Sequence, residues 1–184
     1  WSSGTTTKVI ACAVIAALIV LASVAGYHTI MRLQSVLTWL TGAITILYIA
    51  LTFRDIDLGA VGEMPAGDPQ AVVGALVMLM TGFGLGWINI AADWSRYQRR
   101  DASGARIAFW NTFGGALAPV LLVVYGLMLA GSNPDLIDGI AADPIGTLAT
   151  ILPNWFLVPF LVAAVLALVS GAVLGIYSSG LTLL

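Results

Sequence analysis

Three glycines at alternate positions, Gly82, Gly84 and Gly86, weaken the middle of a long apolar stretch. Their period of two distributes them around a helix, so we expect local unwinding rather than a stripe for helix packing. Trp87 and Asn89 follow directly, and they offer an indole that can stack on a flat ligand and an amide that can donate and accept hydrogen bonds. The alternatives are a packed helix, a tryptophan that serves packing or the membrane interface, and an asparagine that joins helices.

A second group of oxygen atoms is predicted near the end of the chain. Ser178 and Ser179 follow Gly175 by three and four residues, which brings their hydroxyls near its carbonyl on one helical face. Such oxygens suit a hard cation such as Na⁺ if another helix supplies further ligands. Taken alone, this pattern favours the alternative, in which the serines bond back to their own helix.

Both groups must be positioned by helices that cross a membrane. Of the 184 residues, 60% are hydrophobic and 9% are charged, whereas a soluble domain has about 25% charged residues. Five stretches are apolar and near the length of about 20 residues that a span needs, roughly residues 9–27, 36–53, 71–92, 107–131 and 155–184. The sequence therefore predicts an all-α polytopic membrane protein, with one transmembrane domain over residues 1–184.

Other classes of function find no support in the sequence. Neither a basic run that suits nucleic acid nor a Cys/His metal cluster is visible, and the same holds for a nucleotide-binding loop or a nucleophile with a base. An enzyme, an organic cofactor and a metal other than Na⁺ are therefore not expected, and the oligomeric state is left open.

The charges of the loops predict an orientation. Residues 93–106 carry four arginines, and residues 28–35 carry Arg32 without an acid. The positive-inside rule puts both loops in the cytoplasm of a plasma (inner) membrane protein, and loops 54–70 and 132–154 outside. We expect the outer loops to be exposed turns, with room for a short helix near residues 140–152, and Asp93 to pair with Arg96 at the membrane interface. An odd number of spans and the absence of an initial Met indicate a fragment, with helices missing before Trp1 and after Leu184.

Four motifs in the chain resemble the nucleobase:cation symporter-1 family, in its purine/cytosine permease branch. The motifs are GYHTIMRL at 26–33, GWINIAADWSRY at 86–97, FWNTFG at 109–114 and IYSSGL at 176–181. They resemble the family's helix 4–5 turn, helix 6, the start of helix 7, and helix 8. The resemblance implies helices four to eight of a transporter with a LeuT-like inverted repeat, in which the orientation is the one predicted from the charges.

The resemblance also implies roles for the two groups of residues. Gly84, Gly86, Trp87 and Asn89 become candidates for binding a planar heterocycle. Candidates for the cation site are a carbonyl and two hydroxyls, those of Gly175, Ser178 and Ser179, and position 175 departs from the asparagine often found in this motif.

The function expected from the resemblance is cation-coupled symport of a nucleobase, cytosine or a purine, by alternating access. The coupling ion would be H⁺ or Na⁺. Two alternatives are left open: a permease of the same fold for uracil, hydantoin, allantoin or thiamine, and a membrane subunit or receptor that does not transport.

Overall fold

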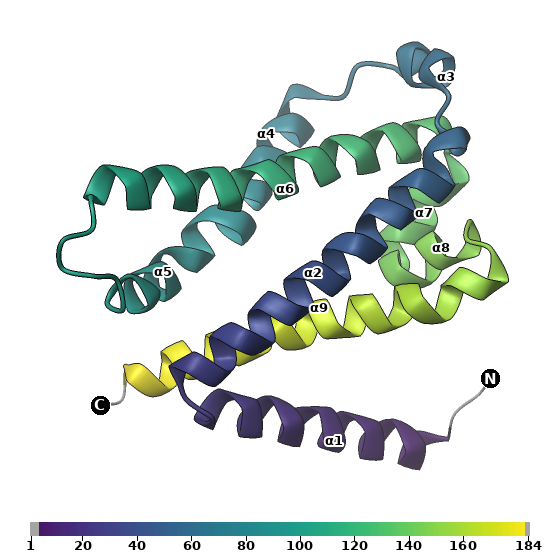
Figure 1. Cartoon of the computed structure of the whole chain (residues 1–184). Coiled ribbons are helices and arrows are strands. Elements are labelled where there is room, and N and C mark those ends of the chain that lie inside the picture. The colour runs from purple at the N-terminus through teal and green to yellow at the C-terminus, as the bar shows by residue number, and fades with distance from the viewer. Residues whose placement is uncertain (1–3, 183–184) are drawn as a thin grey trace. The chain divides into compact units, whose positions relative to one another are not determined.

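The computed structural model describes residues 4–182, except for the side chains of Phe83 and Asn89. Within this part of the chain every regular element is helical (Figure 1). Five helical stretches of the described chain are long and apolar enough to cross a membrane, namely Thr5–Val24, Tyr27–Asp55, Pro69–Ser95, Gly104–Ser132 and Asn154–Leu181. The predicted all-helical, polytopic class with five spans is thereby confirmed.

The chain divides into two compact units. The first unit comprises Trp1–Leu51 and Ile151–Leu184, and the second comprises Thr52–Thr150. The single domain expected over residues 1–184 stays a prediction, and each unit is described by itself.

The first unit consists of α1 (Thr5–Val24), α2 (Tyr27–Thr52) up to Leu51, and α9 (Asn154–Leu181). A turn of two residues separates α1 from α2, and its Gly26 has a φ of 84°, a conformation that glycine adopts without steric cost. Residues 28–35 were expected to be a connecting loop, and this expectation is wrong, since they form the first turns of α2. One left-handed glycine suffices to reverse the chain, so the polar residues that follow it continue the helix.

Polar contacts connect α9 to both other helices of this unit. The Ser23 hydroxyl of α1 is buried, and it lies 2.7 Å from the Ile19 carbonyl of its own helix and 3.3 Å from the Val173 carbonyl of α9, so its hydrogen bond is shared between them. The Gln34 amide of α2 donates to the Ser170 carbonyl at 3.0 Å, and the Ser170 hydroxyl donates to Gln34 Oε1 in return. Buried polar groups in membrane helices need such partners, because lipid offers none.

The second unit consists of one interrupted span, one long helix and short helices in the connections. The interrupted span comprises α4 (Pro69–Leu79), η2 (Met80–Gly84), η3 (Leu85–Trp87) and α5 (Ile88–Ser95). The long helix is α6 (Gly104–Ser132), which continues through Pro119. The short helices are η1 (Phe53–Asp55), α3 (Leu58–Glu63), α7 (Asp135–Ala142) and α8 (Pro144–Thr150).

The connections before α4 and after α6 contain more helix than the exposed turns that we predicted. Asp57 caps α3, since its Oδ1 accepts from the Gly59 amide at 2.8 Å. Asp143 does the same for α8, where its Oδ1 accepts from the Gly146 amide at 2.9 Å. An aspartate that satisfies free amides at a helix start stabilises even a helix of two turns. The short helix expected near residues 140–152 corresponds to the end of α7 together with α8.

Candidate functional site

The span from Pro69 to Ser95 changes its helix type in the middle. The backbone follows α geometry to Leu79, π geometry over Met80–Gly84, 3₁₀ geometry over Leu85–Trp87, and α geometry again from Ile88. The Leu85 amide marks the change, because it donates to the carbonyls of both Met80 and Thr81. The predicted interruption is confirmed, but it is a local change of pitch in a continuing helix and not an extended break.

The glycines differ in what they contribute to this change. A Cβ at Gly86 would lie 3.3 Å from the Thr81 carbonyl oxygen, a tight contact with backbone that cannot easily yield. At Gly82 and Gly84 a Cβ would meet no described atom within 4 Å. Gly84 has φ −103° and ψ −78°, which departs from α geometry while it remains on the right-handed side. Close approach of the backbone therefore favours glycine at position 86, whereas Gly82 and Gly84 make the turn deformable.

Trp87 is the last residue of η3, directly after the change of pitch. Trp87 is 40% exposed, so it is accessible to a ligand. Asn89 lies two residues later in α5, and its side chain is outside the described part of the structure. Gly84, Gly86 and Trp87 thus lie together at the interruption, as the sequence predicted, and the predicted role of the Asn89 amide stays a prediction.

An apolar hollow of about 340 Å³ lies beside the interruption on the side of α6. Leu79 and Gly84 form one wall, and the other comes from one face of α6 around Gly115 and Pro119. Trp87 is not among its lining residues. Because the walls offer almost no polar side-chain groups, this hollow cannot read the edges of a heterocycle, and we do not assign the substrate to it. Its residues on α6 carried no signal in the sequence.

The second predicted group lies on one uninterrupted stretch of α9. The Ser179 hydroxyl donates to the Gly175 carbonyl at 2.9 Å, which is the back-bonding that the sequence favoured as the alternative. Ser178 is buried, with 5% of its surface exposed, whereas Ser179 is exposed. Two oxygens 2.9 Å apart can both contact one cation at bond lengths of about 2.3–2.6 Å. The geometry is thus compatible with back-bonding and with a partial cation site.

A cation at this place would depend on carbonyl and hydroxyl oxygens. Among the described residues, no group of three His, Cys, Asp or Glu side chains is arranged to hold a metal ion. Three oxygens from one helix are fewer than the six or more that a hard cation takes, so other helices would have to complete the shell.

The loop after α5 contains an ion pair that the sequence analysis did not predict. Its ion pair joins Arg99 to Asp101, with Nη2 2.8 Å from Oδ2 and Nε 3.0 Å from Oδ1. Arg96 lies over the Tyr97 ring, 5.9 Å from its centroid, and its predicted pairing with Asp93 stays a prediction. Arg99 and Asp101 are only two residues apart, and they form a bidentate pair because the backbone turns between them. The rule that side chains three or four residues apart interact applies to helices and does not cover this case.

Comparison with known proteins identifies one family. A family model described as permease for cytosine/purines, uracil, thiamine, allantoin matches residues 2–184. No curated protein and no solved structure matches the chain at a significant level.

Proposed function

The chain belongs to the family of permeases for cytosine and purines, uracil, thiamine and allantoin, and from this premise we propose that it imports cytosine or a purine together with a cation. Members of such a family carry small heterocycles across a membrane, which agrees with the five spans of the described chain. The observation that carries the proposal is the change of helix type over Met80–Trp87 within one of these spans. Interrupted helices of transporters commonly contact the substrate near the middle of the bilayer.

The proposed substrate contact is the indole of Trp87, supported by the backbone around Gly84 and Gly86. A planar base stacks on an indole face, and aromatic pairs are worth about 0.5–1.5 kcal/mol beyond the area they bury. Trp87 suits this role because it is half-exposed and lies where the pitch changes. The Asn89 amide, two residues further on, would read the edge of the base.

Uptake by the full-length protein tests the substrate contact. Cells that express it are given radiolabelled cytosine, with unlabelled adenine, uracil, hydantoin, allantoin and thiamine as competitors. In W87A we expect uptake at low substrate concentration to fall about tenfold or more, since stacking and buried area are lost together. The matched control is W39A, because Trp39 is 80% exposed on α2 and lies in the other unit.

Each outcome of this experiment separates two hypotheses. Competition by uracil, hydantoin, allantoin or thiamine, without competition by cytosine or adenine, would replace our substrate by one of the alternatives. Normal uptake in W87A at normal surface expression would refute the role of Trp87. A full chain that binds but never accumulates any of these compounds would favour a receptor or subunit.

We further propose Na⁺ as the coupling ion, held in part by Gly175, Ser178 and Ser179. The support is the 2.9 Å separation of the Gly175 carbonyl and the Ser179 hydroxyl. In S179A we expect the Na⁺ concentration for half-maximal uptake to rise roughly tenfold, since a contact to a charged group is lost. S95A is the matched control, because Ser95 also bonds back to its own helix, to the Ala92 carbonyl at 2.8 Å. Uptake that follows pH and ignores Na⁺ would instead assign H⁺ as the coupling ion.

The proposed mechanism is alternating access without a covalent step, in the plasma (inner) membrane. Four arginines in residues 93–106 support a cytoplasmic position for this loop. A cysteine introduced at Ala102 should then react with a permeant maleimide and resist an impermeant one in intact cells. Labelling by the impermeant reagent would reverse the proposed orientation.

A further inference from the structure

A polar hollow of about 260 Å³ lies where α6 begins. Its walls come from the loop after α5 and from the first two turns of α6, and they include Gln98, Ser103, Arg106, Trp110 and Asn111. Neither the transport mechanism nor the candidate substrate and cation residues use this hollow. It therefore calls for an explanation of its own.

The side chains of this hollow are rich in unused hydrogen-bond donors. Within the described part of the chain, the side chains of Gln98, Ser103, Arg106 and Asn111 have neither a hydrogen bond nor an ion pair. By contrast, the guanidinium of Arg99, in the same loop, is already bound by Asp101. No carboxylate stands among the described residues that line the hollow. One guanidinium, two amides and one hydroxyl thus converge without an acid to neutralise them, which suits an anion with several oxygen atoms.

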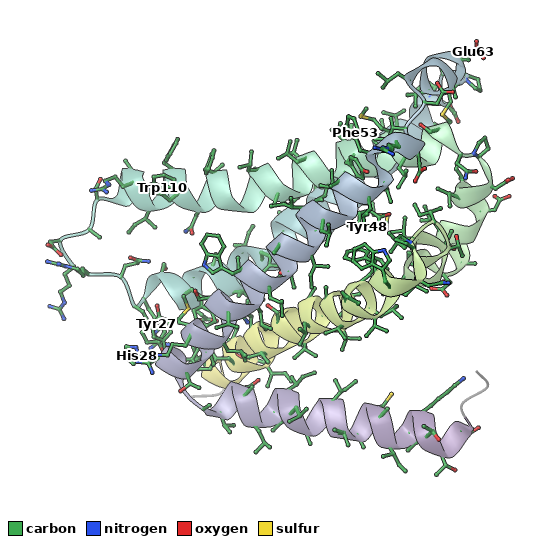
Figure 2. The ribbon with its side chains drawn as sticks, turned by 45° about the vertical axis from the view of Figure 1, so that its right-hand side comes forward. Tyr27, His28, Tyr48, Phe53, Glu63 and Trp110 are labelled. Carbon is green, nitrogen blue, oxygen red and sulfur yellow. The ribbon has the colours of Figure 1, made fainter. Side chains whose placement is uncertain are left out.

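The position of the hollow along the span indicates its depth in the membrane. Arg106 is the third residue of α6. Trp110, labelled in Figure 2, lies one turn further along the same helix. Trp110 is 60% exposed, and its ring contacts the rings of Phe109 and Phe113 at centroid distances of 5.4 and 5.9 Å. Tryptophan at the end of a span prefers the level of the lipid headgroups, where its ring can be half immersed. A guanidinium one turn outside such a ring would lie at the level of the lipid phosphate groups.

We propose that this hollow binds the phosphodiester of an anionic phospholipid. Arg106 would hold two phosphate oxygens through its fork of donors, while the amides of Gln98 and Asn111 contact the remaining oxygens. Ile107 and Trp110 provide an apolar side to the hollow. This side fits the glycerol and first methylenes of a lipid. Free phosphate has no apolar part that could contact it. Residues 93–106 contain four arginines and two aspartates, and one of the aspartates is paired with Arg99. This excess of positive charge favours an anionic over a zwitterionic lipid.

Lipid binding to the purified full chain tests this proposal. The protein in neutral detergent is titrated with phosphatidylglycerol, with phosphatidylcholine and with inorganic phosphate, and bound lipid is counted by native mass spectrometry. We expect phosphatidylglycerol to bind about tenfold more tightly than phosphatidylcholine, and R106Q to abolish that preference, because one charge-assisted contact is lost. R99Q is the matched control and should keep the preference, since Arg99 belongs to the same loop but is already paired with Asp101.

The outcomes support or overturn the proposal as follows. Equal losses in R106Q and R99Q would show that only the general charge of the loop matters, and would overturn a built site. Displacement of phosphatidylglycerol by inorganic phosphate at millimolar concentration would overturn the assignment to lipid. If R106Q does not fold, R106K keeps the charge but loses the fork, and binding should weaken by a few fold. An unchanged preference in R106K would count against a bidentate contact.

Discussion

The reciprocal contact between Gln34 and Ser170 is the clearest polar connection between two spans of the first unit. The Gln34 amide donates to the Ser170 carbonyl at 3.0 Å, and the Ser170 hydroxyl donates back to the Gln34 carbonyl oxygen. Both side chains are partly buried. Ser170 lies inside α9 (Asn154–Leu181), and Gln34 lies in the first turns of α2. We predict that this contact stabilises the packing of α2 on α9.

The two substitutions remove different numbers of hydrogen bonds. Gln34→Met keeps the length of the side chain but removes both bonds, whereas Ser170→Ala removes one and leaves the backbone carbonyl in place. Side-chain hydrogen bonds between membrane helices average about 0.6 kcal/mol and reach about 1.7 kcal/mol. We therefore expect Q34M to lower the free energy of unfolding by about 1.2 kcal/mol and S170A by about 0.6 kcal/mol. These losses correspond to roughly eightfold and threefold changes in the unfolding equilibrium.

Reversible unfolding of the full chain in mixed detergent micelles, titrated with sodium dodecyl sulfate, measures these free energies. In the double variant the bond removed by S170A is already absent, so we expect it to cost no more than Q34M alone. T38V is the matched control: the Thr38 hydroxyl bonds to the Gln34 carbonyl of its own helix at 2.7 Å, and its loss should be nearly neutral. Additive losses in the double variant, or a T38V loss as large as that of Q34M, would refute the reasoning.

Three further predictions concern the second unit. Y125F removes the 2.6 Å hydrogen bond between the Tyr125 hydroxyl and the buried Thr52 hydroxyl. It should lower the free energy of unfolding by about 1 kcal/mol in the same assay. An unchanged free energy of unfolding would contradict a stabilising role of this contact. G131L should cost about 1–3 kcal/mol, because even a Cβ at Gly131 would lie 2.9 Å from Met64 Sδ, and G131A should cost less since Met64 can move. D57A removes the cap of α3. A loss of about 1 kcal/mol in the local stability of α3 should raise the hydrogen-exchange rate of residues 59–62 about fivefold, while exchange of α6 stays unchanged. Equal exchange of residues 59–62 in D57A and in the unsubstituted protein would contradict the capping role.

The interruption at Gly86 could be predicted from the sequence because its causes are local. Glycine at alternate positions lowers helix stability wherever the helix lies, and a Cβ at residue 86 would be in tight contact with the Thr81 carbonyl. The type of interruption could not be predicted, since π and 3₁₀ turns differ by small shifts of the hydrogen-bond partners. The sequence also offered Ser179 two roles, and the bond to the Gly175 carbonyl is the local one that its spacing favoured.

The extent of α2 was predicted wrongly for a different reason. Residues 28–35 include Arg32 without an acid, and they were predicted to be a loop between two spans. The helix instead begins at Tyr27, and Gln34 is accommodated because Ser170, far away in the chain, offers both a donor and an acceptor. Polarity alone cannot separate a loop from a helix whose polar groups find partners on another helix.

By itself the sequence determined the helical class, the five apolar spans and the place where one of them changes pitch. The free energy of transferring a span into lipid and the flexibility of a glycine-rich turn both depend on residues that are close in the sequence. Only the tertiary structure decided which polar groups meet, as with Gln34 and Ser170, or Ser23 and the Val173 carbonyl. The physical reason is that these helices are apolar almost all round, since lipid is as apolar as leucine. A hydrophobic period therefore does not indicate which face of a span contacts its neighbour, and the pairing is set by packing between distant segments.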